Sequence, residues 1–317
     1  MSLNVAFYGA GQLAQPYLQA LARRPDVAVT GVCDPDRRAA EQTAAGWGAR
    51  VFLSFEALLE ETTPHALWVC VPPQVQGDVL LKAIDLRIPF FVEPPGALNY
   101  EQARAYSRQI AEADLVTAVG FSSRYADVVG EAREYLGANP VPLALAWWLC
   151  RPDEGTSMTA EQLLWTDACR FVDALRLFCG EVERVRCLRV GSGAKESGLV
   201  VQLEFASSTV GVLACTTFAR PEPRQELELM GEGWSLSFSD GLTTLRLAER
   251  DKTTILRRLN VPAVDQVQAF LAAVATCNRQ AVSCDYADAL NTLAVCHAAV
   301  LSAREDRPVT LTEVSNA

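Results

Sequence analysis

The first 121 residues alternate short apolar runs with segments in which apolar residues recur at helical spacing. Such runs are typical of strands, and such segments are typical of amphipathic helices. The pattern predicts strands over 3–8, 27–33, 50–53, 66–71, 89–92 and 116–121. It predicts helices over 12–24, 37–45, 77–86 and 100–112, and Ser54 and Asn99 as helix N-caps. Because alternating strands and helices are joined by right-handed crossovers, we expect a doubly wound parallel sheet, the Rossmann fold.

The pattern changes after residue 122. A helix is predicted over 160–178, and then strand-like runs follow one another with short turns between them. These runs cover 182–190, 199–205, 210–218, 226–230, 235–239, 243–248 and 253–258, and two helices, 263–277 and 285–304, close the chain. The sequence therefore predicts two closely coupled domains, an α/β Rossmann domain over 1–121 and an α+β domain over 122–317 with a large, mostly antiparallel open sheet.

One further strand is apolar on both of its faces. In Leu143–Cys150, the odd-numbered residues Leu143, Leu145, Trp147 and Leu149 alternate with an equally apolar set. An open antiparallel sheet normally leaves one face in water, so a second apolar face needs a cover. We expect a partner subunit to supply it, and hence a homo-oligomer, a dimer or tetramer.

Composition narrows the choice of partner and compartment. The formal net charge is −10, which disfavours nucleic acid or an anionic membrane as the main partner. No apolar run reaches the roughly 18 residues of a membrane span, and the first residues do not resemble a signal peptide. The ten cysteines are dispersed without the C-x-x-C spacing of a zinc site. We expect a cytoplasmic protein with reduced cysteines and no metal site.

A glycine-rich turn, Gly9–Ala14, follows the first predicted strand and opens a helix. Gly9 allows a tight turn, Gly11 lets a pyrophosphate approach the backbone, and Ala14 permits close packing of helix on strand. Free N–H groups at the start of a helix favour phosphate. Asp34 follows about 20 residues later, at the end of the second predicted strand, and can accept hydrogen bonds from an adenosine ribose. The sequence therefore predicts a dinucleotide site.

Two questions about this site stay open on the sequence alone. The Asp34 carboxylate would repel a 2′-phosphate, which favours NAD, but Arg37 and Arg38 lie close enough to reverse the preference towards NADP. The alternative for the turn itself is a glycine-rich loop that binds another ligand or none. Pro72, Pro73, Glu93 and Ser122 also follow predicted strand ends, and the carboxyl edge of an open α/β sheet is where ligands bind.

With these residues in place, the chain resembles the glucose–fructose oxidoreductase/inositol dehydrogenase/MocA-like (GFO/IDH/MocA) family over nearly its full length. The segments that carry the resemblance, besides the turn, are 32–34, 66–73, 123–125, 173–180 and 285–304. The resemblance implies an NAD(P)-dependent dehydrogenase or reductase of sugars, polyols or related small molecules. It also implies that the sheet of the second domain builds an oligomer interface.

The departures from the family pattern fall on residues that carry chemistry. The signature Glu-Lys-Pro reads Glu93-Pro94-Pro95, so Pro94 occupies the lysine position. The helix motif Asp-x-Gly-x-His-x-x-Asp reads 166–173, so Arg170 occupies the histidine position and the first aspartate is Thr166 or is displaced to Asp167. A histidine often found after the Pro-Pro segment is Gln76. The residues expected to hold the dinucleotide are Gly9, Gly11, Gln12, Leu13, Asp34, Arg38, Val71, Pro72, Gln76, Glu93 and Pro94.

Reduction of a carbonyl needs a proton donor beside the hydride acceptor. None of the three lysines, Lys82, Lys195 and Lys252, is expected near the site, and neither is His65 or His297. The remaining catalytic candidates are Tyr125, Asp167 and Asp173.

Each candidate has a structural alternative. Asp173 could serve only to orient Arg124 or Arg170, and Tyr125 could be a packing residue. Arg124 and Arg170, together with Trp165, are candidates for substrate binding, because two guanidinium groups suit an anionic ligand such as a carboxylate or phosphate. The alternative is that the arginines pair internally with Asp167, Asp173 or Glu93.

Two functions follow from this sequence. The first is an NAD(P)-dependent oxidoreductase with an atypical acid/base set, acting on a small substrate that is anionic, imine-like or sugar-like. The second is a catalytically silent dinucleotide-binding regulatory or scaffold protein of the same fold, which the joint loss of lysine and histidine would explain.

Overall fold

The computed structural model describes residues 2–150, 158–191, 198–218 and 223–316. The chain divides into two compact units, one of Met1–Ser122 with Val261–Leu290 and the other of Ser123–Asn260 with Asn291–Ala317. The first division falls one residue from the expected boundary. The segment 261–290, which the sequence analysis assigned to the second domain, is grouped instead with the first unit, because its helix packs on that unit.

The first unit is built on a six-stranded parallel sheet in the order β3-β2-β1-β4-β5-β6. Every neighbouring pair in this sheet is parallel, which confirms the predicted Rossmann arrangement. The strand order reverses between β1 and β4, and this reversal is the point at which doubly wound sheets bind ligands. The strands are β1 (Leu3–Tyr8), β2 (Val27–Cys33), β3 (Arg50–Phe52), β4 (Ala66–Val69), β5 (Phe90–Val92) and β6 (Thr117–Val119).

The helices of this unit begin largely where the polar pattern predicts. Ser54 caps α3, since its side chain accepts from the N–H of Ala57 at 3.3 Å, and Asn99 caps α5 by accepting from Gln102 at 2.9 Å. Both predicted N-caps are therefore confirmed. The helices are α1 (Gln15–Leu21), α2 (Arg37–Ala45), α3 (Phe55–Thr62), α4 (Gln76–Asp85), α5 (Tyr100–Glu112) and α9 (Pro262–Thr276), with a 3₁₀ turn η1 (Pro73–Val75) before α4.

The prediction of a helix from residue 12 is wrong at its start. Residues 12–14 form a turn, and α1 begins only at Gln15. Pro16 therefore stands in the first turn, where a missing N–H costs no helical hydrogen bond. The shift matters for the site, because the N–H groups of residues 11–13 lie outside the helix.

Stacked aromatic rings fill the core of the first unit. Trp68 on β4 is fully buried and stacks between Phe7 and Phe91, whose ring centroids lie 5.5 and 6.1 Å from its own. Phe270 on α9 meets the same indole edge-on at 5.2 Å. This contact explains why a helix from the far end of the chain belongs to the first unit.

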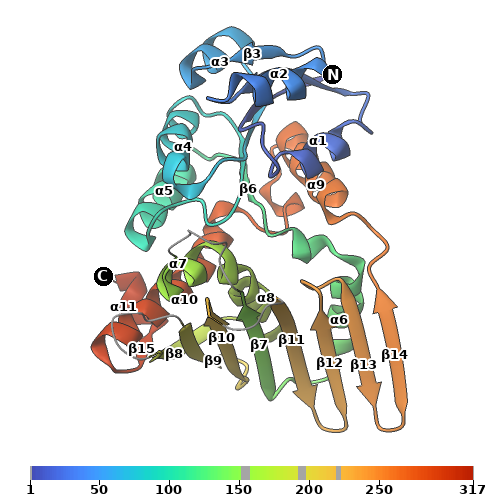
Figure 1. The fold of residues 1–317 in the computed structure, drawn as a ribbon, viewed down its shortest axis with the longest axis vertical. Helices are drawn as coiled ribbons and strands as arrows, with labels where there is room; N and C mark the ends of the chain where they lie inside the picture. Colours follow the sequence, from blue (N-terminus) through green and yellow to red (C-terminus); the bar gives the residue numbers. More distant parts are fainter. Residues whose placement is uncertain (1, 151–157, 192–197, 219–222, 317) are drawn as a thin grey trace. The chain divides into compact units, whose positions relative to one another are not determined.

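The second unit is built on a nine-stranded sheet in the order β14-β13-β12-β11-β7-β10-β9-β8-β15 (Figure 1). Among the strands described, only β7 and β10 pair in parallel, so the predicted mostly antiparallel sheet is confirmed. The strands are β7 (Leu143–Leu149), β8 (Val182–Val190), β9 (Gly198–Phe205), β10 (Val210–Thr216), β11 (Arg224–Gly231), β12 (Trp234–Ser239), β13 (Thr244–Glu249), β14 (Lys252–Arg257) and β15 (Val309–Thr310).

The helices of this unit differ from the prediction in two respects. The single helix expected over 160–178 is α7 (Ala160–Leu163), a π-helical segment η3 (Leu164–Ala168) and α8 (Cys169–Cys179). Four further elements were not predicted from the sequence: β15, a 3₁₀ turn η2 (Ser122–Tyr125), α6 (Asp127–Leu136) and α11 (Leu311–Asn316). Gly130 interrupts the helical pattern of α6, and β15 is too short to leave a pattern. The long helix α10 (Tyr286–Glu305) contains the division between the two units.

The cysteines lie mostly in the core, as predicted. All ten are free thiols and eight are buried, while Cys150 is half-buried and Cys277 is exposed. Burial raises the pKa of the Cys169 thiol to about 12, so this thiol stays protonated. None of the helices in the described part of the chain combines the length and apolar character that crossing a membrane requires.

Candidate functional site

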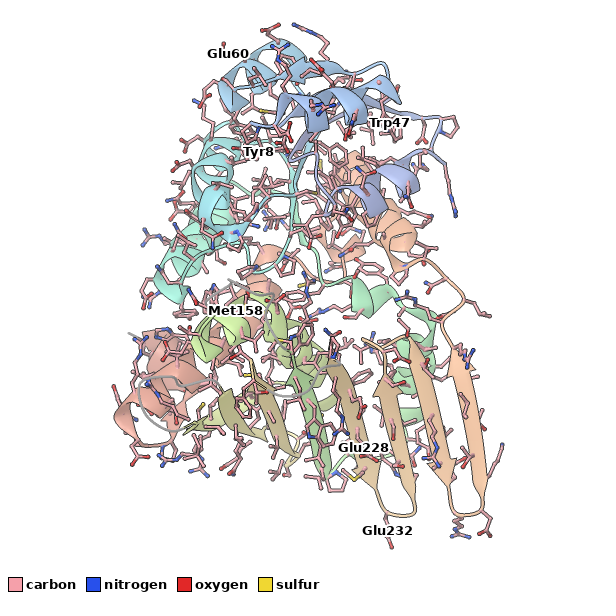
Figure 2. The ribbon with its side chains drawn as sticks, viewed as in Figure 1. Tyr8, Trp47, Glu60, Met158, Glu228 and Glu232 are labelled. Carbon is pink, nitrogen blue, oxygen red and sulfur yellow. The ribbon has the colours of Figure 1, made fainter. Side chains whose placement is uncertain are left out.

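The glycine-rich turn leaves β1 directly after Tyr8, which Figure 2 labels, and it lies at the reversal of strand order. Gly9 has φ of +100°, and its N–H donates to the carbonyl of Cys33 at 2.8 Å. A Cβ on Gly9 would lie 2.3 Å from the carbonyl oxygen of Cys70. Only glycine fits this position, because the backbone conformation and the close approach both exclude a side chain.

Gly11 differs from Gly9, because its surroundings in the fold do not exclude a side chain. A Cβ on Gly11 would meet no atom within 4 Å, so nothing in the fold itself requires glycine there. Gly11, Gln12 and Leu13 are exposed, and their backbone N–H groups have no hydrogen-bond acceptor within the described residues. Three adjacent exposed donors suit the oxygens of a pyrophosphate, and a bare Cα lets that group come close.

Asp34 holds the turn in place from the neighbouring strand end. Its Oδ2 accepts from the N–H of Ala10 at 2.8 Å, and its Oδ1 accepts from the N–H of Asp36 at 2.8 Å. The hydroxyl of Thr43 on α2 donates to the carbonyl of Ala10 at 3.3 Å, so both backbone polar groups of Ala10 are hydrogen-bonded. Each carboxylate oxygen can accept more than one hydrogen bond, and Asp34 is half-exposed, so it can still receive ribose hydroxyls.

These residues fit the dinucleotide that the sequence predicts. The open space at Gly11 and the exposed N–H groups beside it suit the pyrophosphate, and Asp34 suits the adenosine ribose. Arg38 is exposed at the start of α2, and Arg37 pairs with Glu41 at 3.4 Å on the same helix. Arg38 therefore remains an exposed basic residue in the segment that follows Asp34.

The other predicted dinucleotide residues gather at the ends of β4 and β5. Val71, Glu93 and Pro94 are buried, while Pro72 is exposed. Gln76 is completely buried, and its side-chain amide donates to the carbonyls of Val71 at 2.9 Å and Glu93 at 3.1 Å. Gln76 is thus placed to support the two strand ends.

Tyr17 also belongs to this group, although it was not predicted from the sequence. Its hydroxyl on α1 donates to Oε1 of Glu93, and both residues are buried. Tyr17 follows the turn by one helical turn, but nothing in the local pattern separates it from an ordinary core aromatic. Only the tertiary structure brings it to Glu93.

In the second unit the helical motif is interrupted at the predicted catalytic positions. Trp165 and Asp167 both belong to the π-helical segment η3, and both are half-buried. The hydroxyl of Thr166 donates to Asp167 at 2.6 Å and to the carbonyl of Gln162 at 3.0 Å. Burial, and then the nearby Asp167 carboxylate, raise the pKa of the Cys150 thiol. Single-turn π segments inside α-helices are frequent at functional sites.

Asp173 and Arg124 form a buried ion pair. Both oxygens of Asp173 accept from the Arg124 guanidinium, at 2.6 and 2.9 Å, and the side chains are 0% and 6% exposed. This geometry agrees with the alternative in which Asp173 orients Arg124.

The pair belongs to a larger network whose other members the sequence analysis missed. Thr292 on α10 donates to Asp173 at 3.2 Å and accepts from Arg176 at 2.8 Å, and Arg176 also pairs with Glu181 at 2.6 Å. The partner of Asp173 on α10 is 119 residues away in the chain, so no local pattern could have identified it.

The remaining candidates are Tyr125 and Arg170. Tyr125 ends η2, and its carbonyl accepts from the side chain of Asn260 at 2.7 Å. Arg170 is half-buried in the first turn of α8.

The chain's few lysines and histidines lie on several different elements. Lys82 lies on α4, Lys252 begins β14, and Lys195 lies outside the described residues. His65 is exposed at the amino end of β4, away from the turn, and His297 is half-buried on α10.

Residues 3–121 match the family model of the GFO/IDH/MocA oxidoreductase family, NAD-binding Rossmann fold. This part of the chain has an NAD-binding Rossmann fold. The chain is 27% identical over 142 residues to scyllo-inositol 2-dehydrogenase (NAD(+)) of Bacillus subtilis, a match that covers 44% of this chain and 41% of that protein. It is 27% identical over 205 residues to inositol 2-dehydrogenase of Pseudarthrobacter chlorophenolicus, covering 62% and 60%. The first of these matches thus spans about two fifths of the curated relative.

Solved structures resemble the chain over nearly all of its length. One is an oxidoreductase of Agrobacterium radiobacter in complex with NAD+, L-tartaric acid and magnesium, with a TM-score of 0.84, 16% identity and coverage of 99% of each chain. Another is UDP-N-acetylglucosamine 3-dehydrogenase of Acidithiobacillus ferrooxidans, with a TM-score of 0.82, 22% identity and coverage of 96% and 99%. At these identities the likeness establishes the two-part fold. The support for the GFO/IDH/MocA oxidoreductase family comes from the family model over residues 3–121 and from the inositol dehydrogenase relatives.

Replacing each turn glycine by alanine should separate folding from binding. Gly9→Ala should lower the free energy of unfolding by about 2–4 kcal/mol, because its Cβ would meet the Cys70 carbonyl in a strained conformation. Gly11→Ala should leave stability within about 0.5 kcal/mol of the wild type and weaken dinucleotide binding. Urea unfolding and a binding titration measure the two effects, and equal destabilisation by both variants would contradict this account.

The buried ion pair should dominate the stability of the second unit. Asp173→Asn removes the negative charge that accepts two hydrogen bonds from the buried Arg124 guanidinium and should cost about 3–5 kcal/mol. Asp306→Asn, the control, removes the exposed partner of Arg186 and should cost about 0–1 kcal/mol. Urea unfolding of both variants checks this, and similar losses would show that Asp173 has no special role.

Proposed function

We propose that this protein is an NAD(P)-dependent oxidoreductase of the GFO/IDH/MocA family that transfers a hydride to or from a small hydroxylated or carbonyl substrate. The observation that carries the proposal is the turn after β1, where three exposed N–H groups, the open space at Gly11 and the Asp34 carboxylate stand together. The match of residues 3–121 to a family of oxidoreductases supports it.

The names of the relatives suggest the substrate class. The curated relatives are inositol dehydrogenases, and one of the solved structures is a sugar-nucleotide dehydrogenase. We therefore favour a polyol, a sugar or a derivative of one. Arg170 stands one turn beyond Asp167 along the same helical stretch, and a guanidinium there suits an anionic group on such a substrate. Trp165 would offer an apolar face to the same molecule.

NAD is the favoured cofactor. A carboxylate at the end of β2 accepts the ribose hydroxyls of NAD and repels the 2′-phosphate of NADP. The pairing of Arg37 with Glu41 offsets part of the positive charge in the segment after Asp34. Gly11, Gln12 and Leu13 would hold the pyrophosphate, and the bound nicotinamide would supply or accept the hydride.

Among the proton-transfer candidates, Asp167 is the strongest. Asp173 is fully buried with both oxygens engaged by Arg124, so it serves better to orient that arginine than to exchange protons. Asp167 is half-buried on the π segment and holds a hydroxyl neighbour, Thr166. Tyr125 is the second candidate, since its backbone is fixed by Asn260.

A turnover assay tests this function. Purified protein is mixed with NAD+ or NADP+ and a panel of inositols, sugars and their acids, and absorbance at the dihydronicotinamide band is followed. Asp167→Asn should lower kcat/KM for an active substrate by about 10²–10⁴-fold, as expected for loss of a general acid or base. Asp240→Asn, in the β12–β13 turn, is the control and should leave it unchanged.

Unchanged kcat/KM in Asp167→Asn and in Tyr125→Phe would overturn the assignment of the donors. Dinucleotide binding without turnover of any compound in the panel would favour the second function, a silent dinucleotide-binding protein. That alternative rests on the resemblance drawn from the sequence, which puts Pro94 at the family's lysine position and Arg170 at its histidine position.

We also propose that the protein is a homo-oligomer through the outer face of the second unit's sheet. On β7, Ala146 and Trp148 face α8, where Trp148 meets Phe171 at 5.2 Å. The opposite face presents Leu143, Leu145, Trp147 and Leu149, none of which is buried. An apolar row in the middle of a wide sheet is a typical interface core.

Sedimentation equilibrium should give a dimer or tetramer for the wild type. Leu145→Glu should shift it to monomer, because a carboxylate would be desolvated in the interface. Leu86→Glu, at an exposed leucine of the first unit, is the control and should not. A monomeric wild type at micromolar concentration would refute the interface.

A further inference from the structure

We propose that Tyr17 and Gln76 are positioning residues that hold Glu93 for the nicotinamide half of the dinucleotide. This inference rests on the proposed function, and it assigns a role to three side chains of the first unit. We call them the Glu93 clamp, which consists of Tyr17, Gln76 and Glu93.

The backbone N–H, the backbone carbonyl and the side chain of Glu93 are all hydrogen-bonded. Its N–H donates to the carbonyl of Val69 at 3.2 Å, and its carbonyl accepts from Gln76 at 3.1 Å. Its carboxylate Oε1 accepts from the hydroxyl of Tyr17. With 5% of its surface exposed, this carboxylate is desolvated, and a hydrogen bond to a buried charge is stronger than one in water.

The end of β6 closes the third side. A Cβ on Gly120 would lie 3.0 Å from Oε1 of Glu93 and 3.0 Å from the ring of Pro94. Glycine at this position therefore leaves the space in which the carboxylate and the following proline sit. The carboxylate is thereby confined between α1 and the end of β6.

Gln76 is bound in one orientation only. Its amide nitrogen faces two carbonyl oxygens, those of Val71 and Glu93, so turning the amide over would place its own oxygen against them. In this orientation Oε1 of Gln76 is buried and has no hydrogen-bond partner among the described residues. A buried acceptor without a partner is unfavourable, which indicates that the two donated bonds are what this residue is used for.

The clamp connects the two halves of the proposed dinucleotide site, the adenosine half and the nicotinamide half. Tyr17 lies on α1, which follows the pyrophosphate turn, and Gln76 joins the ends of β4 and β5. In a Rossmann sheet the adenosine half lies over the β1–β2 side and the other half over the strands beyond the reversal. Loss of the clamp should therefore weaken contacts to the nicotinamide half and spare those to the adenosine half.

The test compares two probes on the full-length protein by calorimetry. NADH occupies both halves of the site, whereas ADP offers only the adenosine and the pyrophosphate. Tyr17→Phe removes the hydroxyl and keeps the aromatic ring, whose centroid lies 4.6 Å from that of Phe91. Gln76→Met keeps the volume and removes both donated bonds. Tyr135→Phe is the matched control, because Tyr135 donates to Glu249 at 2.9 Å in the second unit.

We expect Tyr17→Phe to raise the Kd of NADH roughly tenfold and leave that of ADP within about twofold, since a strand end that is no longer pre-ordered must be ordered on binding. Gln76→Met should show the same selectivity, and Tyr135→Phe should change neither constant. If Tyr17→Phe fails to fold, Gln76→Met still decides the question.

Equal weakening of NADH and ADP in the clamp variants would overturn the inference, because it would indicate a general structural role. Unchanged NADH binding in both variants would also overturn it. A wild-type protein that binds neither NADH nor ADP would instead refute the proposed function on which the inference rests.

Discussion

The close approach of the Gly9 backbone to the Cys70 carbonyl is the constraint on which the site of the first unit depends. It brings the end of β1 against the end of β4, at the reversal of strand order, and leaves no room for a side chain. The chain then turns sharply enough that α1 starts only at Gln15. Asp34 secures the turn through the N–H of Ala10 and leaves the next three N–H groups exposed. The shape of the turn and the donors proposed to bind a pyrophosphate thus come from the same short segment.

The second unit depends on a different kind of interaction. Asp173 neutralises Arg124 in a buried pair, and Thr292 ties that pair to Arg176. A network of this kind is stable only if every member is satisfied, so its residues are poorly suited to gaining and losing protons. The neighbouring π segment carries half-buried polar groups instead. This contrast favours Asp167 as the proposed proton-transfer residue and Asp173 as the residue that orients Arg124.

Much of the fold could be predicted because its signals are local. The buried parallel strands appear as continuous apolar runs, and Ser54 and Asn99 mark helix starts by the chemistry of their own side chains. The turn residues and Asp34 likewise follow from short-range geometry. What the sequence did not reveal depends on partners far apart in the chain: Tyr17 and Glu93 are separated by 76 residues, and Thr292 and Asp173 by 119. The π segment was not predicted for another reason: its apolar spacing also fits an uninterrupted helix.

The central claim is that the turn after β1 binds a nicotinamide dinucleotide. The most direct measurement is a titration of the purified protein with NADH and NADPH, following energy transfer from tryptophan to the dihydronicotinamide, with the supernatant of denatured protein checked for carried-over nucleotide. Saturable transfer at micromolar NADH, with weaker binding of NADPH, is the result this account predicts. Folded protein that carries no nucleotide and shows no saturable transfer with either compound would contradict it.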